Sequence, residues 1–148
     1  MVQKYFGVKE LVCPHVWERF GESAWVFIDR RLLAVMLWIR EELGLPIVVN
    51  NWAKGGQYSQ RGLRCNCCAL VKEKTALEKV YLSQHIQGKA VDFGVVGMKS
   101  AAVQKWLEEN KERLPYPIRC ERDTNGWTHI DVRVDAEESG ERLIWFNG

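Results

Sequence analysis

The sequence lacks the features that mark several large classes of protein. Its net charge is only +2 and acidic and basic residues are interleaved, so no basic stripe argues for a nucleic-acid partner. The longest apolar stretch, residues 32–39, is far shorter than the roughly 20 residues that cross a bilayer. The first ten residues mix Gln, Lys and Glu with apolar residues, unlike a secretory signal peptide. We therefore expect a cytoplasmic protein without a signal peptide and with neither a nucleic-acid nor a membrane partner.

The cysteines do not form an evident framework. Five are present, an odd number, which argues against a set of disulfides in a chain without a signal peptide. Cys65, Cys67 and Cys68 cluster, while Cys13 and Cys120 stand alone. A structural zinc site wants paired CxxC spacings, and we interpret the run CxCC as lacking them. We expect reduced thiols in a loop; a small thiol protein built around them is a weaker alternative, in which alkylation would abolish function.

What is present fits one globular domain. The chain has 148 residues, 47% of them hydrophobic and 27% charged, enough for one core and too few for two ordinary domains. We expect residues 1–148 to form a single domain and the protein to be a monomer.

The hydrophobic pattern predicts three helices and five strands. Asp29 is the expected N-cap of a helix that runs to about Leu43 and ends at Gly44, and Ser100 is the expected cap of another that runs to Leu114. A short helix is expected at 72–79, after a long irregular segment, 52–71. Strands are predicted at 47–49, 89–95, 118–121, 127–134 and 142–146. This order favours an α+β fold with a small, mostly antiparallel sheet and flanking helices.

Two of the three histidines lie beside strands that carry polar residues on one face. Val91, Phe93 and Val95 alternate with Ala90, Asp92 and Gly94, so Asp92 points away from the apolar face. In the same way His129 shares a face with Trp127, Asp131 and Arg133. If the two strands are neighbours, Asp92 and His129 converge, and His85 reaches the same point because Gly88 lets the chain turn back. Two imidazoles and one carboxylate form a common catalytic zinc set with one position open.

The residues around these three positions carry a family resemblance. The stretch Ser83-x-His85-x-x-Gly88-x-Ala90-x-Asp92 matches the SxHxxGxAxD signature of the M15-type zinc peptidases, which include D-alanyl-D-alanine carboxypeptidases and phage endolysin peptidases. It also resembles the metal-site pattern of the hedgehog signalling domain. Trp127-Thr128-His129-Ile130-Asp131 resembles the second motif in the phage and prophage branch. The resemblance covers about residues 47–133 and implies a hedgehog/DD-peptidase-like fold with Zn²⁺ on His85, Asp92 and His129.

The resemblance also suggests catalytic roles. It implies that Ser83 lies beside the metal, and that an arginine before the first motif holds a substrate carboxylate or the developing oxyanion; Arg61 is preferred here and Arg64 is the alternative. Many relatives carry the general base three residues before the last histidine, where this chain has Gly126. Asp123, at the offset found in hedgehog-type domains, is the first choice for the base. Glu121 and Asp131 are alternatives, and Asp131 is equally suited to orient His129.

Together these observations predict a zinc metallopeptidase that hydrolyses peptide bonds in peptidoglycan stem peptides. An endolysin-type endopeptidase and a carboxypeptidase both fit. Without a signal peptide, a phage or prophage lysis protein that reaches the cell wall after release is favoured over a bacterial intracellular dipeptidase. The alternative, favoured by Gly126, is a non-catalytic zinc-containing module that binds cell-wall fragments or a protein partner.

Overall fold

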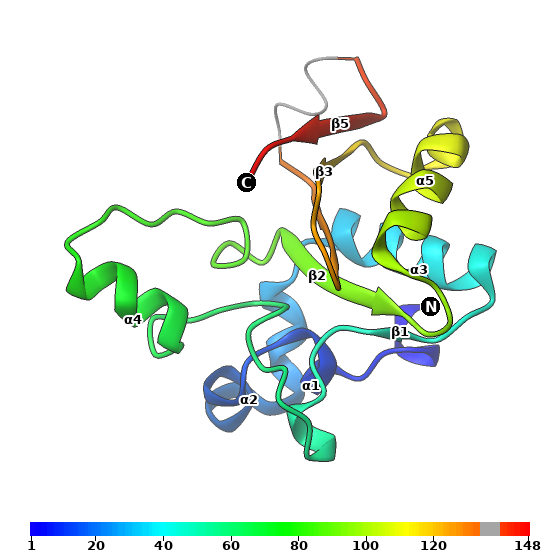
Figure 1. Cartoon of the computed structure of the whole chain (residues 1–148). Helices are drawn as coiled ribbons and strands as arrows, with labels where there is room; N and C mark the ends of the chain where they lie inside the picture. The colour runs from blue at the N-terminus through cyan, green and yellow to red at the C-terminus, as the bar shows by residue number, and fades with distance from the viewer. Residues whose placement is uncertain (134–139) are drawn as a thin grey trace.

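A five-stranded sheet organises the chain in the computed structural model, which describes residues 1–133 and 140–148 (Figure 1). In spatial order the strands are β1 (Ile47–Val48), β2 (Ala90–Val95), β4 (Thr128–Asp131), β3 (Ile118–Glu121) and β5 (Leu143–Phe146). Three neighbouring pairs are antiparallel, and β3 and β5 are parallel. The predicted α+β class is confirmed, with a mixed sheet. The predicted end of one strand at Val134 lies outside the described residues.

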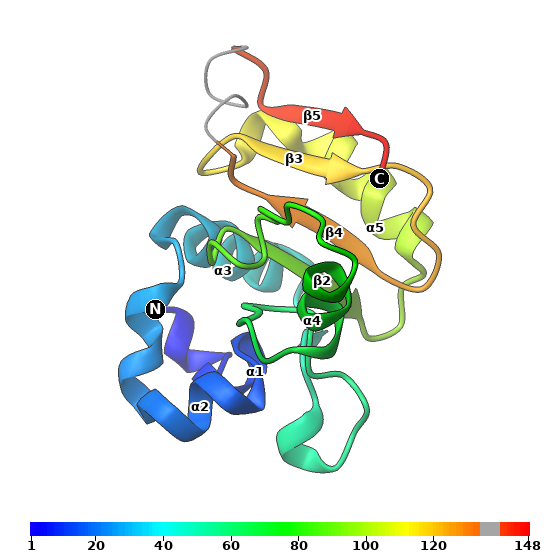
Figure 2. The same cartoon turned by 90° about the vertical axis from the view of Figure 1, so that its left-hand side faces the viewer.

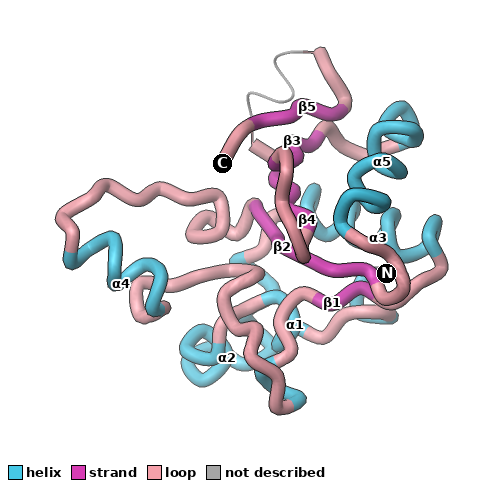
Figure 3. Tube along the Cα trace, in the orientation of Figure 1, coloured by secondary structure: helices cyan, strands magenta, loops and turns pink. Residues whose placement is uncertain are grey.

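Helices lie on both sides of this sheet. The helices α3 (Arg30–Leu43) and α5 (Ser100–Asn110) lie on one side, and α4 (Ala69–Ala76) projects on the other (Figures 1 and 2). Two short helices, α1 (Val8–Leu11) and α2 (Pro14–Phe20), precede them. The described part of the chain also has four 3₁₀ segments, η1 (Val2–Lys4), η2 (Gly21–Phe27), η3 (Trp52–Lys54) and η4 (Lys111–Arg113), and Figure 3 shows the helical segments in cyan. None of the helices described in 1–133 and 140–148 is long and apolar enough to cross a membrane.

The ends of α3 follow the predicted local signals, and the start of α5 does not. The Asp29 Oδ1 accepts a hydrogen bond from the Arg31 backbone N–H at 2.8 Å, and Gly44 ends α3 with a φ of 65°, as predicted. The prediction that Ser100 caps α5 is wrong. Lys99 is the N-cap, and the Ser100 hydroxyl instead donates to the carbonyl oxygen of Thr124 at 3.1 Å.

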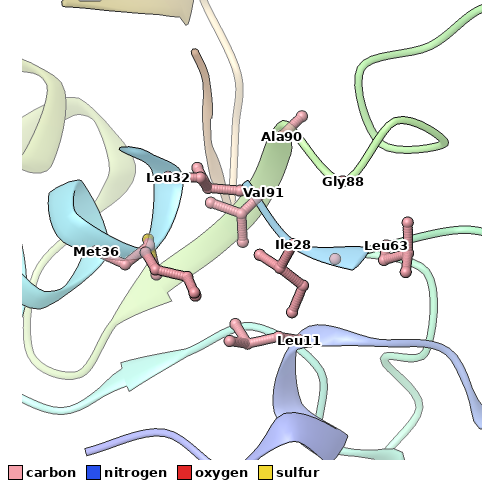
Figure 4. Close-up of a pocket in the computed structure, with 10 residues that line it drawn as sticks. Leu11, Ile28, Leu32, Met36, Leu63, Gly88, Ala90 and Val91 are labelled. Carbon is pink, nitrogen blue, oxygen red and sulfur yellow. The ribbon is translucent and has the colours of Figure 1, made fainter. Parts of the chain in front are cut away.

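The core fills the space between the sheet and α3. From β2 the side chains of Val91, Phe93 and Val95 are buried, and α3 contributes four buried residues, Leu32, Val35, Met36 and Ile39. Figure 4 shows a gap in this packing beside Gly88, walled by Leu11, Ile28, Leu32, Met36, Leu63 and Val91. Its volume of about 10 Å³ is at most what one water needs, so it is a packing defect of the core and not a ligand site.

The turn before β2 requires glycine at position 88. Gly88 has a φ of 67°, and a Cβ there would lie 1.9 Å from the carbonyl oxygen of Phe27. Its own carbonyl accepts a hydrogen bond from the Asp29 backbone N–H at 2.9 Å, directly before α3. The predicted reversal at Gly88 is confirmed, and the close contact locks the turn that carries His85 against the start of α3.

Replacing Gly88 with alanine should therefore destabilise the fold. We expect Gly88→Ala to lower the free energy of unfolding by about 3 kcal/mol or more, because the new Cβ meets backbone as well as an unfavourable φ. Gly97→Ala is the matched control: it has a φ of 85° but no atom within 4 Å of the added Cβ, so only about 1–2 kcal/mol should be lost. Urea unfolding measures both, and equal losses would contradict the clash.

Candidate metal centre

Three side chains converge on the sheet face that is turned away from α3 and α5. His85 lies in the turn before β2, Asp92 on β2, and His129 on β4, where the register pairs it with Asp92. The His129 Nδ1 lies 2.7 Å from Asp92 Oδ1, and the His85 Nε2 lies 3.3 Å from Asp92 Oδ2. One donor atom from each residue lies within 4.8 Å of the others. The predicted convergence is confirmed, and the group can hold a metal ion.

In each imidazole, the nitrogen that lies away from Asp92 (the outer nitrogen) contacts an oxygen that can only accept a hydrogen bond, while the nitrogen near Asp92 is the inner one. The His85 Nδ1 lies 2.9 Å from the Gly62 carbonyl oxygen, and the His129 Nε2 lies 3.2 Å from Asp131 Oδ2. We infer that these nitrogens carry the protons, so in neutral imidazoles the inner nitrogens present lone pairs. In neutral rings both lone pairs face the Asp92 carboxylate, which repels them, and without a metal a proton shared between His129 and Asp92 relieves this repulsion. A cation placed between them relieves this repulsion, so the donor set fits a metal.

The electrostatics of the buried groups favour a positive charge here. Burial would raise the pKa of Asp92, but its hydrogen bonds with His129 and His85 outweigh burial and lower the pKa. Burial would lower the pKa of His129, but the hydrogen bonds with Asp131 and Asp92 raise it to about 9. Both carboxylates are thus ionised at neutral pH and attract the cation that the imidazoles can share.

A second layer of contacts holds His129. Asp131 is fully buried, and its two oxygens accept hydrogen bonds from Arg119 Nε and Nη2, each at 2.8 Å. The Arg119 guanidinium lies 4.3 Å from the centre of the Phe146 ring, which in turn lies 5.6 Å from the His129 ring. Of the two predicted roles for Asp131, this geometry supports the orienting one, because both of its oxygens are occupied and it is closed to solvent. Sequence reasoning missed Arg119 and Phe146.

The remaining motif residues have local roles. The Ser83 Oγ accepts a hydrogen bond from the His85 backbone N–H at 3.2 Å, which holds the turn that presents His85. Ala90 is buried opposite Asp131 in the register. The small side chain of Ala90 therefore lies beside the position that holds His129.

The two arginine candidates are used differently. The Arg64 Nη2 lies 3.3 Å from Asp92 Oδ2, and its Nη1 donates to the Tyr81 hydroxyl at 2.9 Å. The Arg61 guanidinium instead lies over the Tyr58 ring, 3.6 Å from its centre, while the Arg61 carbonyl accepts a hydrogen bond from the Asp92 backbone N–H at 2.7 Å. The charge that reaches the ligands therefore belongs to Arg64, the second choice, and Arg61, the first choice, contributes backbone.

The acid candidates also separate. Asp123 is exposed in a turn with a φ of 56°, and no hydrogen bond or ion pair among the described residues joins it to the three ligands. Glu121 ends β3 on the same face as Arg119, and the register pairs Arg119 with Asp131. Continuing that register by two residues brings Glu121 opposite His129, where cross-strand Cβ atoms are about 5 Å apart. The register thus places the Glu121 backbone across from His129.

A second group of ligating side chains lies outside this centre. Cys13, His15, Cys65 and Cys68 each offer a donor atom within 4.8 Å of the others. The interpretation of the cysteines as lacking a metal-site spacing is therefore corrected: Cys65 and Cys68 form a CxxC pair within the run, and the distant Cys13 and His15 complete the group. The sequence contains both halves of the group, as CxH at Cys13 and His15 and as CxxC at Cys65 and Cys68, but only the fold brings the two halves together.

No family model matches the chain, and no match is found among curated proteins or solved structures.

Proposed function

We propose that the protein is a zinc-dependent peptidase of the M15 type, with a hedgehog/DD-peptidase-like fold, that cleaves peptide bonds in peptidoglycan stem peptides. The observation that carries this proposal is the convergence of His85, Asp92 and His129 with the outer nitrogen of each imidazole already held. The SxHxxGxAxD pattern supports it further. Its Ser, Gly and Ala positions each have a role in presenting the ligands, so the match has a structural basis.

Zinc is the metal that suits this donor set. Two imidazole nitrogens and one carboxylate are typical of catalytic zinc, whereas Ca²⁺ and Mg²⁺ prefer oxygen ligands. Three protein ligands leave a position for water or substrate, and a single anionic ligand leaves the centre net positive. When bound, zinc supplies Lewis acidity, which polarises a scissile carbonyl and makes water acidic enough to attack at neutral pH.

The chain's own residues supply the remaining chemistry. Glu121, half-buried on the site face, is suited to accept a proton from the attacking water and to pass it to the leaving amine. The Arg64 guanidinium is suited to bind a stem-peptide carboxylate or the developing oxyanion, because it already lies at the edge of the centre beside Asp92. The pair Asp131 and Arg119 keeps the His129 ring in one orientation.

The substrate class rests on the motif resemblance. Short stem peptides with free carboxylates match an arginine beside the metal ligands. The form Trp127-x-His129-x-Asp131 resembles the phage and prophage branch, so we include an endolysin-type role in lysis in the proposal. A carboxypeptidase acting on the same stems uses the same centre.

The first test is release of stem peptides from purified peptidoglycan, followed by mass spectrometry. We expect zinc-dependent release by the wild-type chain and none by His129→Ala, because that variant loses one of three ligands. Circular dichroism checks that the variant is folded. Zinc binding without release from several wall chemotypes would instead favour the non-catalytic module, and release by folded His129→Ala would contradict the assignment of the centre.

The position of the proton acceptor gives a second prediction. Glu121→Gln should lower the rate of release about 10²–10⁴-fold at unchanged zinc content, because an amide cannot accept the proton. Asp123→Asn serves as the comparison and should keep nearly full activity. Loss of activity in Asp123→Asn alone would return the role to Asp123.

The support around His129 gives a third prediction. Asp131→Asn should weaken zinc binding about 10–100-fold, because an amide holds both the His129 N–H and Arg119 less well than the carboxylate. Thr128→Val is the control on the opposite face of β4, since its buried hydroxyl has no hydrogen-bond partner among the described residues. Competition with a chromophoric chelator measures both affinities. Equal affinity in the Asn variant and the wild type would show that Asp131 does not orient the ligand.

A further inference from the structure

The group formed by Cys13, His15, Cys65 and Cys68 joins two parts of the chain that are about 50 residues apart in sequence. Cys13 is the N-cap of α2 and His15 lies in its first turn. Cys65 lies in the loop before α4, and Cys68 is the N-cap of α4. The four side chains thus come from two helix starts and one loop, on the α2 and α4 side of the molecule (Figure 1).

The distances between the donor atoms match a tetrahedral zinc site. Ligands at the usual zinc distances of about 2.3 Å for sulfur and about 2.0 Å for nitrogen would lie about 3.8 Å apart for two sulfurs and about 3.5 Å apart for sulfur and nitrogen. The Cys13 and Cys65 Sγ atoms are 3.6 Å apart. The His15 Nδ1 lies 3.6 Å from Cys65 Sγ and 3.9 Å from Cys68 Sγ. These three distances are close to those of a tetrahedral zinc site, and all four donor atoms lie within 4.8 Å of one another.

Backbone N–H groups also organise the turn that carries Cys65 and Cys68. The Cys67 N–H points at Cys65 Sγ at 3.3 Å, and the Cys68 N–H donates to the Cys65 carbonyl at 3.1 Å, which closes the CxxC turn. A hydrogen bond from a backbone N–H stabilises the charged form of the sulfur. Cys13 and Cys68 are buried, Cys65 is partly exposed and Cys67 is exposed, so within the run Cys65 and Cys68 join the group and Cys67 is left at the surface.

We propose that Cys13, His15, Cys65 and Cys68 bind a structural zinc ion, separate from the metal at His85, Asp92 and His129. Four protein ligands with three sulfurs close the coordination sphere, which is typical of structural zinc, whereas the other centre has three ligands and an open position. The inference does not depend on the proposed function, because it concerns different residues and a different readout.

A zinc ion at this position would hold the loop at residues 61–65 in place. Next to Cys13 and Cys65 the chain segments are already joined: the Leu63 N–H donates to Leu11 at 2.8 Å, and the Cys13 N–H donates to Leu63 at 3.2 Å. The same loop carries the Gly62 carbonyl that holds His85 and the Arg64 that contacts Asp92. Zinc bound at the cysteines would therefore fix the loop that positions the other centre.

Metal content of purified variants tests the proposal. After dialysis against buffered zinc, elemental mass spectrometry should find two zinc ions per chain in the wild type and in Cys67→Ser, which removes only the exposed thiol. Cys68→Ser and His129→Ala should each retain one. Two ions in folded Cys68→Ser, or a single ion in the wild type that His129→Ala abolishes, would overturn the second site. A single ion that is lost in Cys68→Ser but kept in His129→Ala would support it while removing the catalytic metal.

Cobalt substitution identifies the ligands independently of the count. We expect a near-ultraviolet thiolate-to-cobalt absorption in the wild type, in Cys67→Ser and in His129→Ala. If Cys68→Ser does not fold, His15→Ala at the exposed edge of the group should fold and change this spectrum. Spectra of Cys68→Ser and His15→Ala that equal the wild-type spectrum would overturn the proposal. A Cys13–Cys65 disulfide in the purified protein, with no sulfur-bound cobalt after reduction, would also overturn it.

Discussion

The pairing of β2 with β4 is the constraint on which the candidate centre depends. It sets Asp92 opposite His129 and buries Val91, Phe93 and Ile130 on the other face, so the same ladder forms the core and the polar group. The carboxylate between two imidazoles is costly to bury unless a positive charge is shared among them. The raised pKa of His129 and the lowered pKa of Asp92 both show that the charged forms stabilise each other in this group.

Alternation in the sequence placed Asp92 and His129 on the polar faces of their strands, and the family resemblance implied the full set with His85, which lies in a turn before β2. The sequence was also enough for α3, whose cap and end are local signals. The contributions of Arg119 and Phe146 could not be predicted this way, since they depend on which strands pair and in what register, and the same register is needed to prefer Glu121 among the three acid candidates. The choice between Arg61 and Arg64 depended on rotamers within an irregular loop. The short helices α1 and α2 were missed because each is too brief to show a period.

The loop at residues 61–65 connects the two metal-ligating groups. Its backbone contacts Asp92 and His85, its Arg64 side chain contacts Asp92, and its last residue, Cys65, belongs to the cysteine group. This segment has no helix or strand of its own, and contacts at both of its ends hold its backbone in one position. This explains how a long irregular stretch can position a buried centre.

The alternation along β4 also bears on errors in folding. A slip of one residue in the pairing with β2 would place Ile130 among the polar groups and drive His129 into the apolar core. Such a misaligned chain would bury an imidazole without its partners and expose a core side chain at once, so it would be disfavoured on both faces. The arrangement that forms the centre therefore also raises the free energy of this slipped pairing, so the polar ligands help to fix the register of β4 against β2.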